Sequence, residues 1–255
     1  MLGLDLRSSE LLYCIIMYTL FIADLHLSEE CPDLTEKFLQ FLQAQAAQAD
    51  ALYILGDLFA AWIGLDFEPA LNQNIMTVLK ELSQKGVPIY FMQGNRDFAI
   101  NKRICKKFGM ILLHDPDVIN LYGTNILLSH GDIFCTLDTN YQAIRKLMHN
   151  AFFQCIARRL PLFMRKRLMT RYKTQSAQYK PKKTPDMMDV EKATVDKFMQ
   201  KYQVHYLIHG HTHKGKIHEF THNNQKITRI VLHNWDQKGH ALSCNNSLTF
   251  QSISF

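Results

Sequence analysis

The segment Thr19-Leu20-Phe21-Ile22-Ala23-Asp24-Leu25-His26 combines a short apolar run with two polar residues close behind it. Short apolar runs rich in branched and aromatic side chains are typical of buried strands. The same unit, an apolar run followed by polar side chains, recurs at residues 52–55, 89–92, 126–129 and 206–208. The sequence therefore predicts several strands that each present polar groups at one end.

Between these runs, apolar residues recur at helical spacing, at positions 38, 39, 41, 42 and 46 and again at 75, 78, 79 and 82. Alternating strands and helices predict an α/β core. After His213 the pattern changes to alternating, β-branched runs at residues 215–222, 227–233 and 248–253, which predict mostly antiparallel strands. Two sheets, each covered by helices on its outer face, satisfy both halves of the pattern and place the strand ends on one rim.

The chain has 255 residues, of which 47% are hydrophobic, and no long polar linker divides it. We expect one domain over residues 17–255, preceded by a non-essential extension over residues 1–16, because Met17 stands just before the first apolar run. The apolar run 11–23 is shorter than the roughly 20 residues needed to cross a bilayer. Its removal as a signal peptide would take away the strand that carries Asp24, so we expect a cytoplasmic chain.

The six cysteines include no C-x-x-C pair. Their scattered positions fit neither a zinc knuckle nor a small disulfide scaffold, so we expect them to be reduced and buried.

Five segments carry candidate metal ligands. They are Asp24-Leu25-His26, Gly56-Asp57, Gly94-Asn95-Arg96-Asp97, His130-Gly131-Asp132 and His209-Gly210-His211-Thr212-His213. In an extended segment, residues two apart point to the same side, and we expect this geometry for Asp24 with His26 and for His211 with His213. Mixed Asp, Asn and His ligands favour manganese, iron or zinc over magnesium or calcium. Seven candidate ligands exceed what one ion with open positions needs, so the sequence predicts two divalent ions, and we expect manganese.

Each motif alone is weak evidence, because a lone G-D or G-N pair usually marks a turn and a lone H-G-D is usually incidental. The order D-x-H, G-D, G-N-x-D, H-G-D and G-H-x-H is much stronger evidence, and over residues 18–213 it resembles the calcineurin-like metallophosphoesterase family. The resemblance implies an α/β fold, a four-layer αββα sandwich. It implies that Asp24, His26, Asp57 and His213 hold one ion and that Asp57, Asn95, His130 and His211 hold the other, with Asp57 as the bridge. We also expect catalytic roles for Asp57, Asn95, Arg96 and His130.

Arg96 departs from many members of that family, which carry histidine at this position. Arginine cannot act as a general acid near neutral pH, but its planar fork can hold phosphate oxygens. We therefore expect a leaving group that needs no proton, such as a phosphate, and hence a pyrophosphate bond as the target.

Local sequences agree with that expectation. Residues 23–27, 53–59, 94–98, 160–167 and 207–213 resemble the family of UDP-2,3-diacylglucosamine diphosphatases, and this similarity covers about residues 17–220. It implies that metal-activated water attacks the α-phosphorus of the UDP moiety. The products would be UMP and 2,3-diacylglucosamine 1-phosphate (lipid X), in lipid A biosynthesis. The implied substrate contacts are Asn95, Arg96, Asp138, Ser176, Lys180, Lys183 and His211, with Tyr141 nearby.

Residues 137–183 are expected to form an inserted helical lid, because Leu160, Phe163, Met164, Leu168 and Tyr172 recur at helical spacing. Such a stripe often only docks on a core, but the acyl chains of a lipid substrate would need an apolar groove. Residues 158–183 include ten basic and no acidic side chains, against a net charge of +6 for the whole chain. We expect this block to hold the protein peripherally on the anionic cytoplasmic face of the inner membrane, as a monomer.

Two other functions fit part of the sequence. A metallophosphoesterase acting on nucleotides or nucleic acid would explain the basic block but not the apolar face beside it, and we expect no nucleic acid partner. A non-catalytic scaffold with the same fold would not need the complete set of ligands.

Overall fold

The computed structural model describes residues 17–66, 70–179, 189–222 and 225–255. The strands are β1 (Tyr18–Ile22), β2 (Ala51–Leu55), β3 (Ile89–Met92), β4 (Met110–Leu112), β5 (Asp117–Leu121), β6 (Thr124–Ser129), β7 (Tyr206–His209), β8 (Lys216–His222), β9 (Gln225–Val231), β10 (His240–Asn245) and β11 (Phe250–Ser254). The α-helices are α1 (Pro32–Ala44), α2 (Ala70–Gln84), α3 (Lys102–Lys107), α4 (Thr139–Met148), α5 (Ala151–Arg159), α6 (Leu162–Tyr179) and α7 (Lys192–Tyr202), and the short 3-10 helices are η1 (Ala46–Gln48) and η2 (Asp132–Phe134).

These strands form two sheets. One has six strands in the order β11-β10-β1-β2-β3-β4, and the other has five in the order β5-β6-β7-β9-β8. In the first sheet β1 to β4 are parallel to one another, and in the second β6, β7 and β9 are parallel. Because parallel strands end on the same edge, the loops after β1, β2 and β3 leave the first sheet together, as do those after β6 and β7 in the second.

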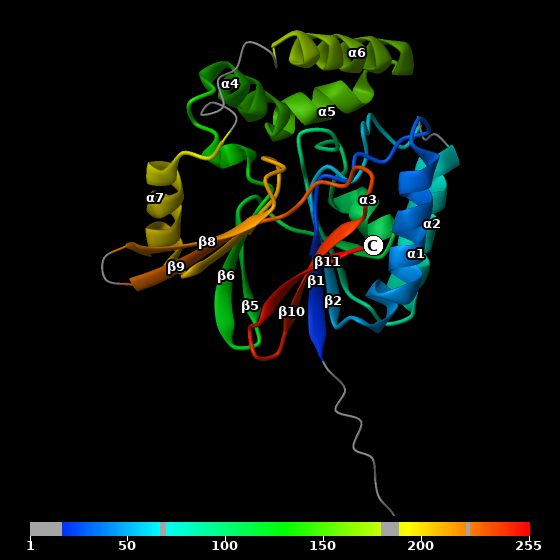
Figure 1. The fold of residues 1–255 in the computed structure, drawn as a ribbon. Coiled ribbons are helices and arrows are strands. Elements are labelled where there is room, and N and C mark those ends of the chain that lie inside the picture. The colour runs from blue at the N-terminus through cyan, green and yellow to red at the C-terminus, as the bar shows by residue number, and fades with distance from the viewer. Residues whose placement is uncertain (1–16, 67–69, 180–188, 223–224) are drawn as a thin grey trace, which may run out of the picture.

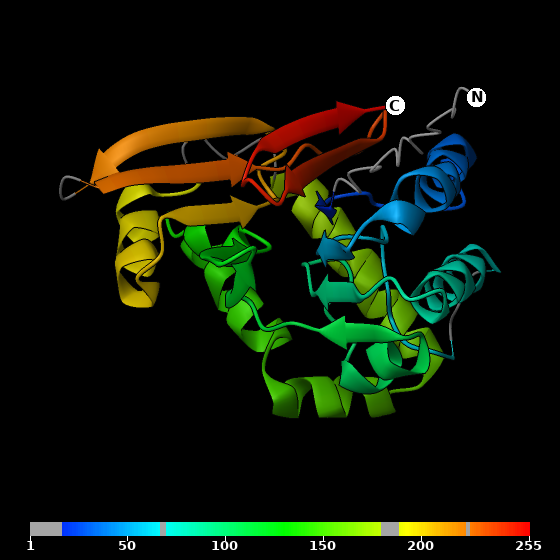
Figure 2. The ribbon, with the colours of Figure 1, turned by 90° about the horizontal axis from the view of Figure 1, so that it is seen from below.

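Three apolar clusters correspond to the contacts between layers. The inner faces of both sheets share one cluster, which includes Phe21, Leu128 and Ile208. The outer face of the six-stranded sheet packs against α1 and α2, and the outer face of the other sheet packs against α7. Figures 1 and 2 show α7 on one side of the sheets and α1 and α2 on the opposite side. The four-layer αββα fold predicted from the sequence is confirmed.

Helix α1 illustrates how the sequence dictates a layer. Its buried residues Leu34, Phe38, Phe41 and Leu42 recur at spacings of three and four, so one side of the helix is apolar. Pro32 opens the helix, where its missing N–H and fixed φ cost nothing. The buried side covers the six-stranded sheet.

Helices α4, α5 and α6 lie together beyond the rim where the strand ends meet (Figure 1). They fall between the metal-loop motifs that follow β6 and β7, as an insertion does. We call these three helices the lid. Ser176 lies within α6, whereas Lys180 and Lys183 lie outside the described residues.

The C-terminal strands differ from the expectation in one respect. Strands β8 and β9 are antiparallel, as are β10 and β11, but β9 pairs in parallel with β7. Strand β10, which the sequence pattern does not predict, inserts between β1 and β11 and carries the chain back into the six-stranded sheet.

The five described cysteines are free, as expected, but their predicted burial is wrong in part, because Cys31 is exposed and Cys155 is half-buried. Among the described helices, none is both long and apolar enough to span a membrane.

Candidate metal centre

The five predicted loops come together at the rim. The backbone N–H of Asp24 donates to Gly56 O at 3.1 Å, and that of His26 donates to Asp57 O at 3.0 Å, which joins the loops after β1 and β2. In the other sheet, the N–H of Gly210 donates to His130 O at 2.9 Å. The two sets are linked by the N–H of His211, which donates to Asp24 Oδ2 at 2.6 Å.

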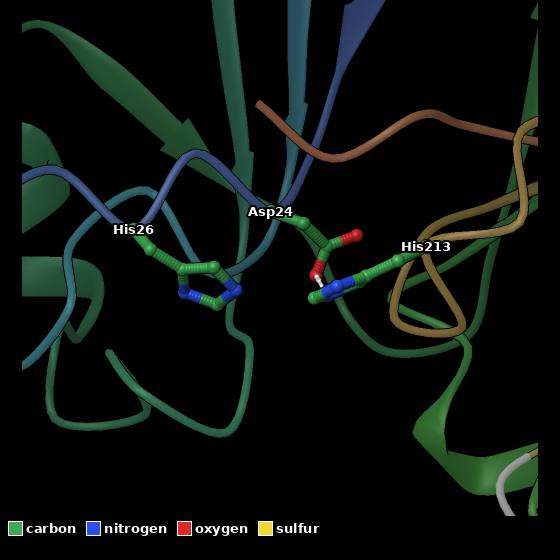
Figure 3. A group of neighbouring side chains, drawn as sticks. All are labelled: Asp24, His26 and His213. Carbon is green, nitrogen blue, oxygen red and sulfur yellow. Dashed lines mark ion pairs between the residues drawn. The ribbon is translucent and has the colours of Figure 1, made fainter. Parts of the chain in front are cut away.

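Asp24, His26 and His213 form a first group of side chains that could hold an ion, with one ligand atom from each within 4.8 Å of the others. Asp24 lies between the two imidazoles, which come from loops far apart in the sequence (Figure 3). His213 Nε2 is 3.4 Å from Asp24 Oδ1, and the rings of His26 and His213 are 5.5 Å apart.

Asp24, Asp57 and His130 form a second such group, and all three are buried. His130 Nε2 is 3.2 Å from Asn95 Oδ1, and the His130 and His211 rings meet edge to face at 5.1 Å. His130 Nδ1 is 2.9 Å from Leu55 O, so this contact fixes the orientation of the ring. The structure thus brings all seven predicted ligands to one rim. Asp24 belongs to both groups, whereas the resemblance assigns the bridging role to Asp57.

The local backbone differs from the expected one. Asp24, His26, His211 and His213 all have positive φ, from 51° to 69°, so neither histidine motif is an extended segment. His26 and His213 nevertheless approach Asp24 from two sides, while His211 lies with His130. The expectation that His211 and His213 point to the same side of a strand is wrong, because the chain curls after β7 instead of continuing it.

Glycines allow this close approach. A Cβ on Gly94 would lie 2.2 Å from Asp57 Oδ1, and one on Gly210 would lie 2.5 Å from Asp24 Oδ2. Asp97 then fixes the Gly94 loop, because its carboxylate accepts from the N–H groups of Gly94 at 2.9 Å and Leu58 at 2.8 Å.

Three buried carboxylates near the rim have pKa values shifted in different directions, because burial raises all three but neighbouring histidines act most strongly on Asp24. Burial, which the imidazole of His130 opposes and Asp97 and Asp24 reinforce, raises the pKa of Asp57 to about 8. Burial also disfavours the charged form of Asp24, but His213, His130 and His26 outweigh it and lower that pKa. Burial raises the pKa of Asp97, although the N–H groups that donate to its carboxylate and the nearby His130 oppose this shift.

The pKa values of the histidines are also shifted in different directions. Burial lowers the pKa of His26 to about 4 and that of His211 to about 4. For His130, burial is outweighed by the carboxylates of Asp57, Asp132 and Asp24, which raise the pKa to about 9. His26 and His211 are therefore neutral near pH 7, as metal ligands must be.

These residues fit a pair of divalent ions. Asp24 Oδ1 is fully buried and lies 3.4 Å from His213 Nε2 without a well-formed hydrogen bond, an arrangement that a cation beside this oxygen would stabilise. Carboxylate, amide and imidazole donors together suit manganese, iron or zinc. An ion between these groups would remove the repulsion between Asp24 and Asp57.

The predicted substrate contacts are distributed around this centre. Arg96 is half-buried, and its N–H donates to Asp57 Oδ1 at 2.7 Å. Asp138 is buried and caps α4, accepting from the N–H of Tyr141 at 3.1 Å. Tyr141 stacks on His211 at 5.8 Å. The side chain of Ser176 and all of Lys180 and Lys183 lie outside what the structure describes.

Several residues of the site have no signal in the sequence strong enough to predict them. Arg145 forms ion pairs with Asp115 and Asp132 behind His130. Asp115 and Arg145 stand alone in the sequence without a motif, and the H-G-D motif that contains Asp132 does not indicate its partner. Tyr172 reaches the site from the lid, where burial raises its pKa and contact with Asn95 opposes the shift. His209 precedes the two histidine ligands of its motif and is buried against Phe134, where burial lowers its pKa to about 3.

An apolar pocket of about 400 Å³ lies between the lid and the body. Its lining joins Trp62 and Phe98 of the body to Leu147, Leu168 and Tyr172 of the lid. A pocket of this size and polarity suits an apolar ligand. Tyr172 connects it to the metal centre, because Tyr172 also contacts Asn95.

Comparison with known proteins agrees with this geometry. Residues 17–215 match the family model of calcineurin-like phosphoesterases. The chain therefore belongs to the calcineurin-like phosphoesterase family. Within it, the chain is 48% identical over 223 residues to the UDP-2,3-diacylglucosamine hydrolases of Salmonella typhimurium strain LT2 and Salmonella newport strain SL254, covering 88% of this chain and 93% of each relative.

Among solved structures, vacuolar protein sorting 29 from Cryptosporidium parvum is similar over 94% of this chain and 98% of its own, with 12% identity and a TM-score of 0.47.

Proposed function

We propose that this chain hydrolyses the pyrophosphate bond of UDP-2,3-diacylglucosamine, giving 2,3-diacylglucosamine 1-phosphate and UMP in lipid A biosynthesis. The observation that carries the proposal is a complete set of metal ligands beside an apolar pocket of about 400 Å³. The 48% identity to hydrolases of that name supports the same substrate. A polar nucleotide end and an apolar acyl end match the two parts of the site.

Two manganese ions are proposed at the rim. Asp24, His26, Asp57 and His213 would hold one, and Asp57, Asn95, His130 and His211 the other. Such a pair polarises water and neutralises phosphoryl oxygens in the transition state. Asp57, Asn95, Arg96 and His130 are the proposed catalytic residues.

The chain itself supplies substrate binding and orientation. Arg96 is a permanent cation whose planar guanidinium would hold phosphate oxygens. It cannot act as an acid, but none is needed, because the sugar phosphate leaves without taking up a proton. Asn95, Asp138, Ser176, Lys180, Lys183 and His211 are the other proposed substrate contacts. The pocket beneath the lid would take an acyl chain away from water.

The lid would also hold the protein on the membrane. Phe152 and Phe163 are 75% and 71% exposed, and the exposed cations Arg159, Lys166 and Arg167 lie on the same helices. Basic residues near an anionic surface contribute about 1 kcal/mol each. We propose that the protein is a monomer attached peripherally to the cytoplasmic face of the inner membrane, and that residues 1–16, which lie outside the described residues, are not needed for activity.

Two assays test the function. Purified protein with manganese is expected to turn over the lipid-linked UDP-sugar at least 100-fold faster than a nucleotide diester, and faster turnover of the diester would refute the substrate. Asp57→Ala should abolish turnover with an unchanged circular dichroism spectrum. Fewer than one bound ion per wild-type chain after manganese reconstitution would favour the scaffold instead.

A further inference from the structure

Helix α4 of the lid touches the metal centre through side chains that no motif marks. Tyr141, Gln142 and Arg145, spaced one and three residues apart, all reach the turn that follows β6. Gln142 Nε2 donates to the carbonyl oxygens of Asp132 at 2.8 Å and Cys135 at 3.1 Å. One side of α4 is therefore fixed to the loop that carries His130.

Arg145 is the centre of this contact. Its Nε donates to Asp132 Oδ1 at 2.8 Å and its Nη2 donates to Asp115 Oδ2 at 2.6 Å. The Arg145 side chain is 11% exposed, and the side chains of Asp115 and Asp132 are 6% and 1% exposed. Nearby carboxylates outweigh burial and raise the pKa of Arg145 further, so the guanidinium stays charged. It links two acids that the sequence separates by 17 positions.

Both acids act on metal ligands. The other oxygen of Asp115 accepts from the Ser129 hydroxyl at 2.6 Å and from the His130 N–H at 3.2 Å. The other oxygen of Asp132 accepts from Tyr141 at 2.6 Å, and the Tyr141 ring lies on His211. The network thus reaches both His130 and His211, which belong to the same half of the centre.

No equivalent contact among the described residues runs from the lid to His26 or His213. The lid therefore contacts one ion site through a rigid charged network and leaves the other to the loops after β1 and β7. Breaking a buried ion pair by removing one partner is strongly unfavourable because the remaining charge is uncompensated. Movement of α4 away from the rim would expose Asp115 and Asp132 to solvent or leave them buried without their cationic partner.

We propose that Arg145 is a positioning residue that couples seating of the lid to occupancy of the ion site formed by His130 and His211. This inference rests on the metal pair of the proposed function but not on the substrate. Ion binding orders the His130 loop, the ordered loop holds Arg145, and Arg145 holds α4. By thermodynamic reciprocity, a seated lid strengthens binding of that ion by the same factor.

The test is a manganese titration of the metal-free full chain. Calorimetry measures the affinity of each ion, and electron paramagnetic resonance distinguishes an exchange-coupled pair of ions from an isolated one. Arg145→Lys keeps the charge but loses the fork, so we expect the affinity of one of the two ions to fall about 10- to 100-fold, the range for lost partners of metal ligands. The exchange-coupled signal should give way to an isolated-ion signal at the same manganese concentration.

Hydrogen exchange tests the reciprocal half. Manganese should increase protection of the α4 amides in the wild type and not in Arg145→Lys. Lys146→Gln, an exposed neighbour on the same helix, is the matched control and should behave as the wild type in both measurements. A merely structural role for Arg145 would lower protection with and without manganese alike and leave both affinities unchanged.

The proposal is overturned if Arg145→Lys binds both ions with wild-type affinity, or if manganese protects α4 equally in the variant. A wild type that takes up fewer than two ions overturns it together with the metal pair. A wild-type chain that binds both ions but does not turn over the lipid substrate would count against the proposed substrate alone. Asp115→Asn provides a second variant of the same network and is expected to weaken the same ion.

Discussion

At the scale of single residues, five of the seven candidate ligands have a left-handed backbone. The φ angles are 56° at Asp24, 51° at His26, 55° at Asp57, 69° at His211 and 59° at His213. Each such conformation in a residue with a Cβ costs on the order of 1 kcal/mol or more. Hydrogen bonds between the loops hold these angles.

Arg96 gives a residue-scale prediction. Its backbone is fixed at both ends, because its N–H donates to Asp57 Oδ1 and its carbonyl accepts from the Trp62 N–H at 3.0 Å. Arg96→Lys should therefore keep the position but lose two-point contact with phosphate. We expect kcat/KM to fall at least about 10-fold, the loss for about 1.4 kcal/mol of transition-state contact, with unchanged manganese content. Arg103→Lys, an exposed change on α3, is the control, and equal kinetics for both variants would contradict the role.

At the scale of elements, α6 is held to the body by Arg165. Its Nη1 donates to Ile63 O at 2.7 Å and to Asp66 Oδ1 at 2.8 Å, beside Gly64, where a Cβ would lie 2.2 Å from the same nitrogen. Arg165 also lines the apolar pocket, so this link sets the position of α6 over it.

Asp66→Asn should loosen that link. Because the Asp66 side chain is 58% exposed, the pair contributes at most about 1 kcal/mol, which corresponds to a rise in KM for the lipid substrate of up to about fivefold. Steady-state kinetics and hydrogen exchange of α6 measure the effect. Glu29→Gln removes an exposed acid elsewhere and should leave KM and the hydrogen exchange of α6 unchanged. Wild-type hydrogen exchange of α6 in Asp66→Asn would refute the link.

His149, at the C-terminal end of α4, predicts a pH dependence of the lid. Burial, reinforced by Arg145, lowers its pKa below 6.5. An opened lid would bind the proton near pH 6.5 while the packed lid does not, so acidification through that value favours opening. We expect protection factors of the α4 amides, normalised for intrinsic exchange, to fall between pH 7.5 and 5.5. His149→Gln should make them independent of pH, and a pH-independent wild type would contradict this.

The elements also show which features the sequence could predict. Strand β3 was predicted with its observed bounds, because an apolar run and its ligands are adjacent in the chain. Strand β10 was missed because its partners, β1 and β11, are set by the tertiary fold rather than by its own pattern. The ligands themselves were found from short motifs. The Asp115–Arg145–Asp132 network was not, because ion pairs between isolated charged residues leave no periodic signal.

At the scale of the whole molecule, the ion ligands come from both sheets. Asp24, Asp57 and Asn95 follow strands of the six-stranded sheet, and His130 and His211 follow strands of the five-stranded sheet. The inner faces of the sheets also meet through apolar packing, and hydrogen bonds such as that from the His211 N–H to Asp24 Oδ2 cross between the two halves. Ions bound here would join the two halves of the sandwich and the lid above them (Figure 1).

This arrangement predicts that manganese stabilises the entire fold. Ions that bind only the folded chain stabilise it by RT ln(1 + [L]/Kd), about 2.7 kcal/mol per site at 100 times Kd. For a domain of this size that corresponds to a rise in Tm of about 5–10 °C. Removal of the ions by a chelator should lower Tm as one cooperative transition, because ligands from both sheets lose their partner together, and the repulsion between buried Asp24 and Asp57 returns. Asp57→Ala should remove most of the manganese effect while raising the Tm of the metal-free chain. If manganese shifts only a separate transition of the lid, the ions do not join the sheets, and the stabilising role assigned to the metal centre is wrong.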